Sequence, residues 1–450
     1  MQSKSRSRQM DMLHGSLLDK ILLFALPLAA SSILQQLFNS ADAAVAGRFA
    51  GSQALAAVGG NAPVVGLIIN MFVGMSVGAN VIIANYIGQK REEKVHEAVH
   101  TVYVMAVLLG VIMLIAGQVI AKPILVLIHT PSDVIDLATL YLRIYFCGMP
   151  CVMIYNFGAA ILRSIGDTKR PLYCLLISGI INVILNVFFV VLCQLSVAGV
   201  AIATIIADTV SAVMVTVFLI RSTDGIKLNL KELTLKKEYV KKVVQIGAPA
   251  GLQGAVFSIS NVCIQAGING FGTAAIAGSA AALNFEYFTY FSTNAFGQAA
   301  VTFVSQNYGA RQFERCKKAL LLSLFSGMIV TALMSVTFVI GRTPFVSIYT
   351  NDPAAIQYGI IRMGIVELFE FIACLYEIPG GALRGIGHSL LPAILTVFGS
   401  CGLRIVWIYT VFQKFHTYQV LMSVYLVTWI VTSILVLGAY FIVTRKVYRA

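Results

Sequence analysis

Long apolar stretches separated by short polar connectors make up most of the chain. A membrane-spanning helix requires about 20 predominantly apolar residues. Twelve stretches reach that length, at roughly 17–40, 52–84, 95–119, 134–160, 171–192, 197–220, 243–268, 275–305, 317–340, 355–382, 390–412 and 418–444. Several contain glycine or proline, which is typical of tilted and bent helices. The pattern predicts an all-α integral membrane protein with twelve transmembrane helices.

The composition agrees with this prediction. Of the 450 residues, 58% are apolar and only 11% are charged. Soluble globular proteins are about half apolar and about a quarter charged, so we exclude a soluble protein. The net charge of +13 does not indicate nucleic-acid binding, because the basic residues lie between apolar stretches and form no single patch.

The basic residues predict the orientation in the membrane. With both ends of the chain in the cytoplasm, 25 Lys and Arg residues fall on the cytoplasmic side and only four on the other, namely Arg48, Lys122, Arg342 and Lys414. Cytoplasmic connectors carry such an excess. We therefore expect a multi-pass protein of the plasma (inner) membrane with both termini cytoplasmic. No signal peptide is expected, since no small-residue cleavage site follows the basic N-terminus.

The two halves of the chain repeat each other on either side of a basic connector. Three motifs recur at one offset of 221 residues: 51–56 with 272–277, 85–90 with 306–311, and 161–166 with 382–387. A fourth pair is 25–27 with 247–249. We predict an N-terminal tail (1–14), an N-lobe (15–220), a linker (221–242), a C-lobe (243–444) and a C-terminal tail (445–450). Six-plus-six repeats are typical of secondary transporters.

One acid, Asp42, ends the first apolar stretch, with no basic residue before Arg48. An ionised carboxylate in hydrocarbon is costly, so Asp42 needs a partner, water or a proton. The pairs Asn182/Asn186 and Thr204/Asp208 are each spaced to share a helix face, and helical rise places them near the depth of Asp42. We predict that all five residues form a coupling site. The alternatives are a structural buried acid and interhelical amide contacts.

At this point the chain resembles the multidrug and toxic compound extrusion (MATE) transporters over about residues 15–445. The motifs that carry the resemblance are Gln-Leu-Phe-Asn-x-x-Asp-x-x-x-x-Gly-Arg (36–48), the loops 162–171 and 383–392, and Asn182-x-x-x-Asn186. The resemblance implies two six-helix lobes around a central cavity. It implies export of organic, often cationic compounds in exchange for protons or sodium ions. It also implies a cation site at Asp42, Asn182 and Asn186. Two acids of one branch are replaced near Phe257 and Ala373, which favours a DinF-like branch.

The second half contains further charged residues inside apolar stretches. We predict that Glu286 and Glu370 line the substrate cavity together with Gln36 and Asn156. Arg404 is predicted to form a structural ion pair with Glu377 or Glu370, although these acids could equally serve substrate or protons. Arg362 is expected to extend to the outer interface. Neither of the residues that align with Asp42, Cys263 and Ile264, is acidic.

The sequence thus predicts a secondary active antiporter. No cofactor is expected beyond H⁺ or Na⁺ as the coupling ion, and the expected partners are small organic molecules and the bilayer, with the protein a monomer. An alternative is a flippase for a lipid-linked sugar or lipid, which requires a more cationic cavity. A membrane-embedded enzyme is the third hypothesis. It ranks last because it requires a nucleophile–base or metal constellation, and we expect neither an HExxH nor a GxSxG motif. Without a P-loop, direct ATP hydrolysis is not expected either. No catalytic residue is predicted, and no metal is expected at His96, His100 or His388. The eight cysteines are expected to be small buried hydrophobes.

Overall fold

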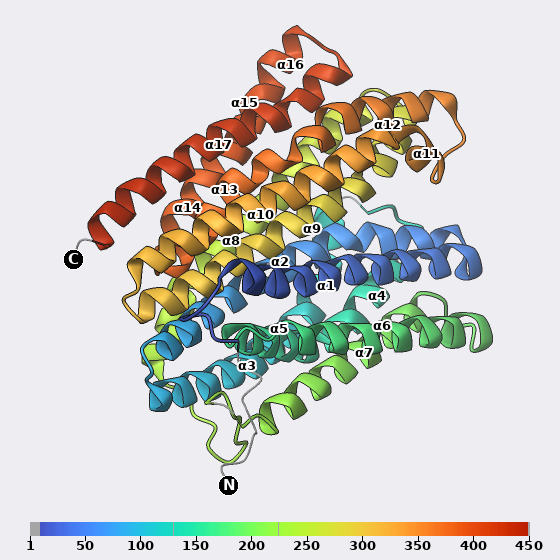
Figure 1. Cartoon of the computed structure of the whole chain (residues 1–450). Helices are drawn as coiled ribbons and strands as arrows, with labels where there is room; N and C mark the ends of the chain where they lie inside the picture. Colours follow the sequence, from blue (N-terminus) through green and yellow to red (C-terminus); the bar gives the residue numbers. More distant parts are fainter. Residues whose placement is uncertain (1–9, 129, 224, 449–450) are drawn as a thin grey trace. The chain divides into compact units, whose positions relative to one another are not determined.

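The computed structural model describes residues 10–128, 130–223 and 225–448 (Figure 1). All regular secondary structure in this part of the chain is helical, which confirms the predicted all-α class. The outermost parts of the two predicted tails, residues 1–9 and 449–450, lie outside the described residues, as does one residue of the predicted linker, Asp224.

The elements follow one another as long helices interrupted by short π and 3₁₀ turns. In the first half they are α1 (Leu18–Val45), η1 (Ala46–Ala50), α2 (Ser52–Gly88), α3 (Glu92–Leu127), α4 (Ile135–Cys147), α5 (Met149–Ser164), α6 (Lys169–Val187), η2 (Phe188–Leu192) and α7 (Ser196–Ile220). In the second half they are α8 (Lys237–Asn269), α9 (Thr273–Gly309), α10 (Phe313–Ile340), α11 (Arg342–Ser347), α12 (Pro353–Ile365), η3 (Glu367–Ala373), α13 (Cys374–Gly385), α14 (Leu390–Thr396), η4 (Val397–Gly402), α15 (Leu403–Tyr409), α16 (Val411–Lys414) and α17 (Tyr418–Val447).

The helices have the lengths that a bilayer requires. Among the described residues, nine are long and apolar enough to cross a membrane, and α4 with α5, bent by 49° at their junction, provide a tenth span. Helix α9 and the run from α12 to α13 are the remaining long segments. The arrangement is consistent with twelve spans.

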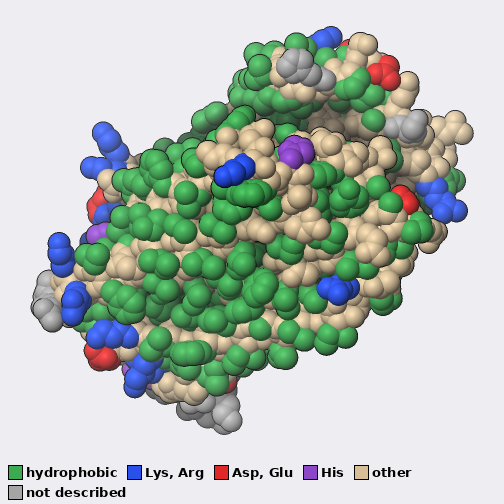
Figure 2. Space-filling model, turned by 90° about the horizontal axis from the view of Figure 1, so that it is seen from above, with side chains coloured by type: hydrophobic (Ala, Val, Ile, Leu, Met, Phe, Trp, Pro, Cys, Tyr) green, Lys and Arg blue, Asp and Glu red, His purple; other side chains and the backbone are tan. Residues whose placement is uncertain are grey.

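Many large apolar side chains face outward. Ile340, Leu127 and Phe398 are 81%, 75% and 70% exposed, and hydrophobic side chains cover most of the face in Figure 2. Apolar surface of this extent is not stable in water. It is suited to lipid, because acyl chains are as apolar as these side chains.

The backbone repeats at the interval that the sequence predicts. Helices α2 and α9 begin and end 221 residues apart, at 52 and 273 and at 88 and 309. Before each of them stands a glycine in the left-handed region, Gly51 with φ 93° and Gly272 with φ 88°. Lys90 and Arg311 share a positive φ of 56° and 58° in the turns that follow. L-residues with a Cβ seldom adopt this conformation, so its recurrence reflects one turn built twice.

The helices pack into two compact units. One contains Met10 and residues 30–244, and the other contains residues 11–29 and 245–450. In the second unit, Phe24 of α1 packs edge-to-face on Phe303 at 5.8 Å. The Arg315 guanidinium donates to the carbonyls of Met12 and Gly15 at 3.1 and 3.0 Å. The predicted N-lobe, 15–220, included all of α1, whereas the packing divides this helix after Ala29.

Small residues allow close helix contacts inside the second unit. A Cβ at Gly278 of α9 would lie 2.1 Å from the backbone oxygen of Ala355 and 2.8 Å from the backbone nitrogen of Gly359, both in α12. Small residues at such crossings let two helix backbones approach closely in a membrane. The contact therefore depends on glycine at position 278.

We expect Gly278→Ala to lower the free energy of unfolding by about 1–3 kcal/mol, because the added methyl group must push α9 and α12 apart. Denaturant titration in mixed micelles measures this change. Gly438→Ala is the matched control, since no atom lies within 4 Å of a Cβ at that position of α17. Equal stabilities of the two variants would contradict the tight crossing.

Candidate functional site

In the first unit, Asp42 lies where two regular helices give way to π-helical turns. Asp42 is 8% exposed and precedes η1 by one helical turn. Asn186 is fully buried and precedes η2, and the two π segments pack against each other. Short π-helical segments inside helices occur frequently at functional sites.

The Asn186 side chain is the main hydrogen-bond donor to Asp42. Its Nδ2 donates to Asp42 Oδ1 at 2.5 Å and to Asn182 Oδ1 at 3.2 Å, which uses both amide hydrogens. Thr204 Oγ1 lies 3.4 Å from Asp42 Oδ2 but 2.9 Å from the Val200 carbonyl, and a hydroxyl has one hydrogen to give. Asp42 thus has one firm donor and one weak one.

The carboxylate has no cationic partner among the described residues, where only amide and hydroxyl donors reach it. The Asn186 Oδ1 atom is buried and also lacks a hydrogen-bond partner in this part of the chain. Neutral donors compensate a buried charge incompletely. The cluster therefore combines a carboxylate whose charge is only partly compensated, Asp42, with an adjacent oxygen that accepts no hydrogen bond, Asn186 Oδ1.

Asp208 adds a second acid to this region of the first unit. It lies one turn from Thr204 on α7, is half-buried, and interacts electrostatically with Asp42. Tyr141 and Tyr145 of α4, which stack at 6.2 Å, interact with both acids. The structure thus brings Asp42, Asn182, Asn186 and Thr204 into one hydrogen-bonded cluster. The two tyrosines were not predicted, because nothing in the sequence places α4 beside α7.

In the second unit, Glu286 of α9 forms a buried ion pair with Arg362 of α12. Arg362 donates from Nε at 2.6 Å and from Nη2 at 2.8 Å, one bond to each carboxylate oxygen. The side chains are 7% and 3% exposed. The expectation that Arg362 extends to an interface is therefore wrong, because a carboxylate within reach holds it inside. Glu286, predicted to line the cavity, has its charge neutralised by this pair.

The pairing predicted for Arg404 does not form among the described residues. Glu377 instead contacts Arg384 at 3.4 Å, and both side chains belong to α13. The guanidinium of Arg404 donates to Asn261 Oδ1 at 2.9 Å and lies 4.6 Å from the Tyr425 ring centre. Arg384 follows Glu377 by seven residues, which is about two helical turns, so both side chains lie on one face of α13. Glu377 therefore pairs with Arg384 of its own helix and not with Arg404.

The remaining acids lie on the 3₁₀ segment η3. Glu367 accepts a hydrogen bond from Thr289 at 2.6 Å, and the carboxyl groups of Glu367 and Glu370 interact with each other. Both residues are buried. A 3₁₀ stretch inside a helical run often marks a functional hinge. Glu370 is thus placed beside another acid rather than beside Arg404.

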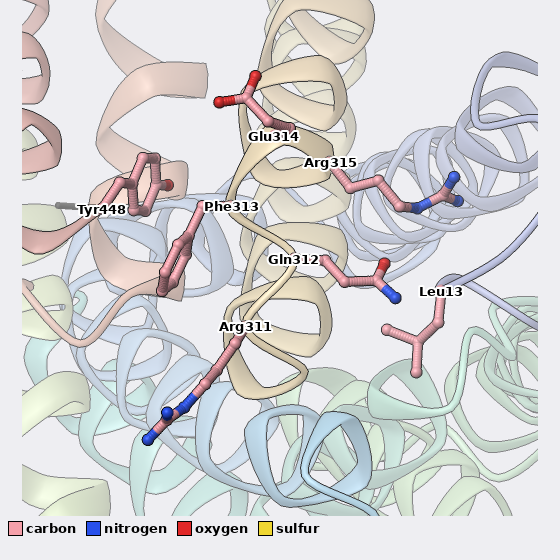
Figure 3. Close-up of a pocket in the computed structure, with 7 residues that line it drawn as sticks. All are labelled: Leu13, Arg311, Gln312, Phe313, Glu314, Arg315 and Tyr448. Carbon is pink, nitrogen blue, oxygen red and sulfur yellow. The ribbon is translucent and has the colours of Figure 1, made fainter. Parts of the chain in front are cut away.

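The other predicted cavity residues belong to the first unit. Gln36 is half-buried on α1, and Asn156 of α5 donates its amide to the Val152 carbonyl at 2.9 Å. The second unit contains a surface pocket of about 530 Å³ beside the turn between α9 and α10 (Figure 3). None of the predicted site residues lines this pocket; its lining consists of Leu13, Arg311, Gln312, Phe313, Glu314, Arg315 and Tyr448.

The expectation that neither a GxSxG nor an HExxH motif is present is wrong, because the sequence contains one of each. Residues 74–78 read Gly-Met-Ser-Val-Gly, but Ser76 lies within α2 and donates to the Val73 carbonyl, without the strand-to-helix turn of a nucleophile elbow. Residues 96–100 read His-Glu-Ala-Val-His. The structure places His96 and His100 beside Glu232, with one ligand atom from each within 4.8 Å of the others. The expectation that these histidines are not spaced for a metal is therefore corrected.

Glu286→Gln is expected to lower the free energy of unfolding by about 3–5 kcal/mol, because it leaves the Arg362 charge buried and unpaired. Adding Arg362→Met removes that charge and should recover most of the loss. The control is Glu314→Gln in the exposed pair with Lys317, where about 1 kcal/mol or less is expected. Denaturant titration in mixed micelles measures the free energy of unfolding. Equal losses in Glu286→Gln and Glu314→Gln would contradict a stabilising role of the buried pair.

Comparisons with known proteins agree on one family. The MatE family model matches the chain twice, over residues 27–188 and 249–410, once in each half. The probable multidrug resistance protein YoeA of Bacillus subtilis is 25% identical over 393 residues, covering 85% of this chain and 84% of that protein. The probable multidrug resistance protein NorM of Thermotoga maritima is 26% identical over 390 residues, covering 84% and 82%.

A solved structure shows the same fold. The outward-facing conformation of a multidrug resistance MATE family transporter superposes with a TM-score of 0.91 at 20% identity and covers 99% of this chain and 99% of that one. The double match of the family model also supports the internal repeat, because the same model matches once in each half. Together these findings show that the chain belongs to the MatE family of multi-pass membrane transporters.

Proposed function

We propose that this protein is a secondary active antiporter that exports organic, mainly cationic compounds in exchange for protons or sodium ions. Family membership and the names of the two relatives, both probable multidrug resistance proteins, support export of small molecules. The observation that carries the coupling proposal is the buried Asp42 carboxylate with only neutral donors. Such a group is stable when a proton or a cation compensates it.

In the proton form of the proposal, protonation reverses the polarity of the Asp42–Asn186 contact. A proton on Asp42 Oδ1 turns that oxygen into a donor, and the Asn186 amide hydrogens that face it offer no acceptor. Rotation of the Asn186 amide presents its unpartnered Oδ1 to the new proton. The same rotation removes the donor to Asn182. Proton binding thereby changes the contacts between α1 and α6, and this is the step that we propose couples to transport.

In the sodium form, the ion binds to oxygen atoms that the cluster already gathers. Asp42 offers two carboxylate oxygens, and Asn182, Asn186 and Thr204 each offer one. Hard cations prefer carboxylate, carbonyl and hydroxyl oxygens. The Asn186 Oδ1 atom is again the oxygen without a partner. Both forms use the same residues, so the coupling ion must be identified by transport measurements.

On the substrate side, the proposal assigns contacts to polar residues of each unit by itself, namely Gln36 and Asn156 in the first and Glu370 with the neighbouring Glu367 in the second. Flipping of a lipid-linked sugar is less favoured. A pyrophosphate group requires free basic side chains, whereas Arg362 and Arg384 are already paired with Glu286 and Glu377. The alternating-access movement, with α1 rearranging when Asp42 changes its proton or cation, remains part of the proposal.

Asp42→Asn should reduce ion-driven export by at least about fivefold, because coupling free energies between linked sites are about 1–3 kcal/mol. The assay follows efflux of a fluorescent organic cation from energised inverted vesicles. Asp136→Asn is the matched control, since its side chain is 85% exposed and forms a surface ion pair with Lys122. Efflux by Asp42→Asn equal to that of the control would remove Asp42 from the mechanism.

Vesicles with only one imposed gradient separate the two ions. A proton gradient alone should drive export if protonation is the switch, and a sodium gradient alone should drive it if the oxygen cluster binds Na⁺. Asn186→Leu removes the unpartnered oxygen and one donor, so we expect it to weaken either response. Export that continues without any gradient would overturn the antiport proposal.

A further inference from the structure

The linker between the two halves folds back onto the first turns of α3. Four side chains from two adjacent turns of α3 contact the linker: His96, Glu97, His100 and Thr101. Helix positions one and four apart present such a contiguous surface. All of these residues and the linker residues that they contact belong to the first unit.

Three of these contacts gather metal-ligand atoms. His96 and His100, one turn apart, have ring centres 4.1 Å apart. Glu232 reaches them from the linker, with its Oε2 3.1 Å from His96 Nε2. One ligand atom from each residue lies within 4.8 Å of the other two. Two histidines and one carboxylate are a donor set that binds zinc in proteins, with water in the fourth position.

The hydrogen bonds around His100 orient it as a ligand. Its Nδ1 bonds to the His96 carbonyl at 2.7 Å, so Nδ1 carries the hydrogen and Nε2 offers its lone pair. Metal-bound histidines commonly have their second nitrogen held in this way. His100 Nε2 accepts the Asn229 backbone N–H at 3.0 Å, and Asn229 Nδ2 donates to Glu232 Oε1 at 2.5 Å. The backbone N–H of Asn229 in the linker thus occupies the His100 nitrogen that would bind a metal ion.

We propose that His96, His100 and Glu232 bind a divalent first-row transition-metal ion of the Zn²⁺ class, which fastens the linker to α3. Nitrogen donors exclude Mg²⁺ and Ca²⁺, which require oxygen ligands. On binding, the ion takes over the Nε2 lone pair of His100 and the Asn229 N–H turns away from it. The ion then joins two segments that are 132 residues apart between His100 and Glu232.

The site is structural rather than hydrolytic. In an H-E-x-x-H enzyme the central glutamate acts as the general base beside the metal. Here Glu97 accepts hydrogen bonds from Lys236 Nζ and from the Tyr239 hydroxyl, the latter at 2.7 Å. A glutamate held by a lysine and a tyrosine is occupied on both oxygens. The motif thus supplies the spacing of the two histidines, whereas its glutamate, Glu97, holds the linker through hydrogen bonds.

The test uses the full-length protein purified in detergent with a tag that contains no histidine. Equilibrium dialysis against ZnCl₂ followed by elemental analysis measures bound zinc per chain. We expect one zinc per chain in the wild type and an affinity at least about tenfold lower in His96→Ala and Glu232→Gln. Both side chains are partly exposed, at 42% and 54%, so these variants should fold, whereas His100 is fully buried.

His388→Ala and Glu238→Gln are the matched controls, because both residues are exposed and neither belongs to the cluster. Both should bind zinc as the wild type does. Trypsin provides a second readout, since the linker contains Lys227, Lys231 and Lys236. Zinc should slow cleavage there in the wild type and in the controls, and should not slow it in Glu232→Gln.

Three outcomes would overturn the proposal. The first is a wild type that binds no zinc, and the second is zinc binding that is equal in all five proteins. The third is linker protection that follows acidification alone and is indifferent to zinc, which would indicate a charged His96–Glu232 pair instead. Zinc binding that is lost in the two cluster variants, retained in the two controls and accompanied by linker protection supports the site.

Discussion

A polar group in a membrane-spanning helix must find its partner inside the protein, because lipid offers none. The two units meet this constraint differently. In the second unit, two acids face guanidinium groups: Glu286 pairs with Arg362 and Glu377 pairs with Arg384. In the first unit, Asp42 faces only amides and a hydroxyl. The former arrangement holds two helices in one position, whereas the latter is complete only when a proton or a cation joins it.

The contrast explains why only one of the two repeats carries the proposed switch. The halves share the bounds of α2 and α9 and the left-handed residues that flank these helices, Gly51 with Gly272 and Lys90 with Arg311. Neither residue that aligns with Asp42 in the second half, Cys263 or Ile264, has a carboxyl group, and Ile264 is 1% exposed. A buried ion pair compensates its own charges, and losing one partner is strongly destabilising. A transporter needs one part that responds to the ion and another that keeps its packing.

Much of this could be predicted from the sequence, and the remainder depended on tertiary structure. Hydrophobic length and the 221-residue offset predicted the helices and the repeat, and i,i+4 spacing predicted that Asn182 and Asn186 share a face. The partners of Arg362 and Arg404 could not be predicted, because several acids lie at similar depth and only the packing of α9, α12 and α13 selects among them. The histidine motif was readable at 96–100, but its third member, Glu232, becomes a neighbour only when the linker folds back.

The paired left-handed turns at Lys90 and Arg311 also bear on the history of the chain. A turn of the wrong hand would redirect every helix that follows it, so such a turn is inherited or lost as a whole. A charged side chain, in contrast, can be exchanged by one substitution. Two halves with the same turns and different acids are what gene duplication followed by divergence leaves behind. In this molecule the repeat thus belongs to the backbone, whereas the proposed ion chemistry belongs to one half alone.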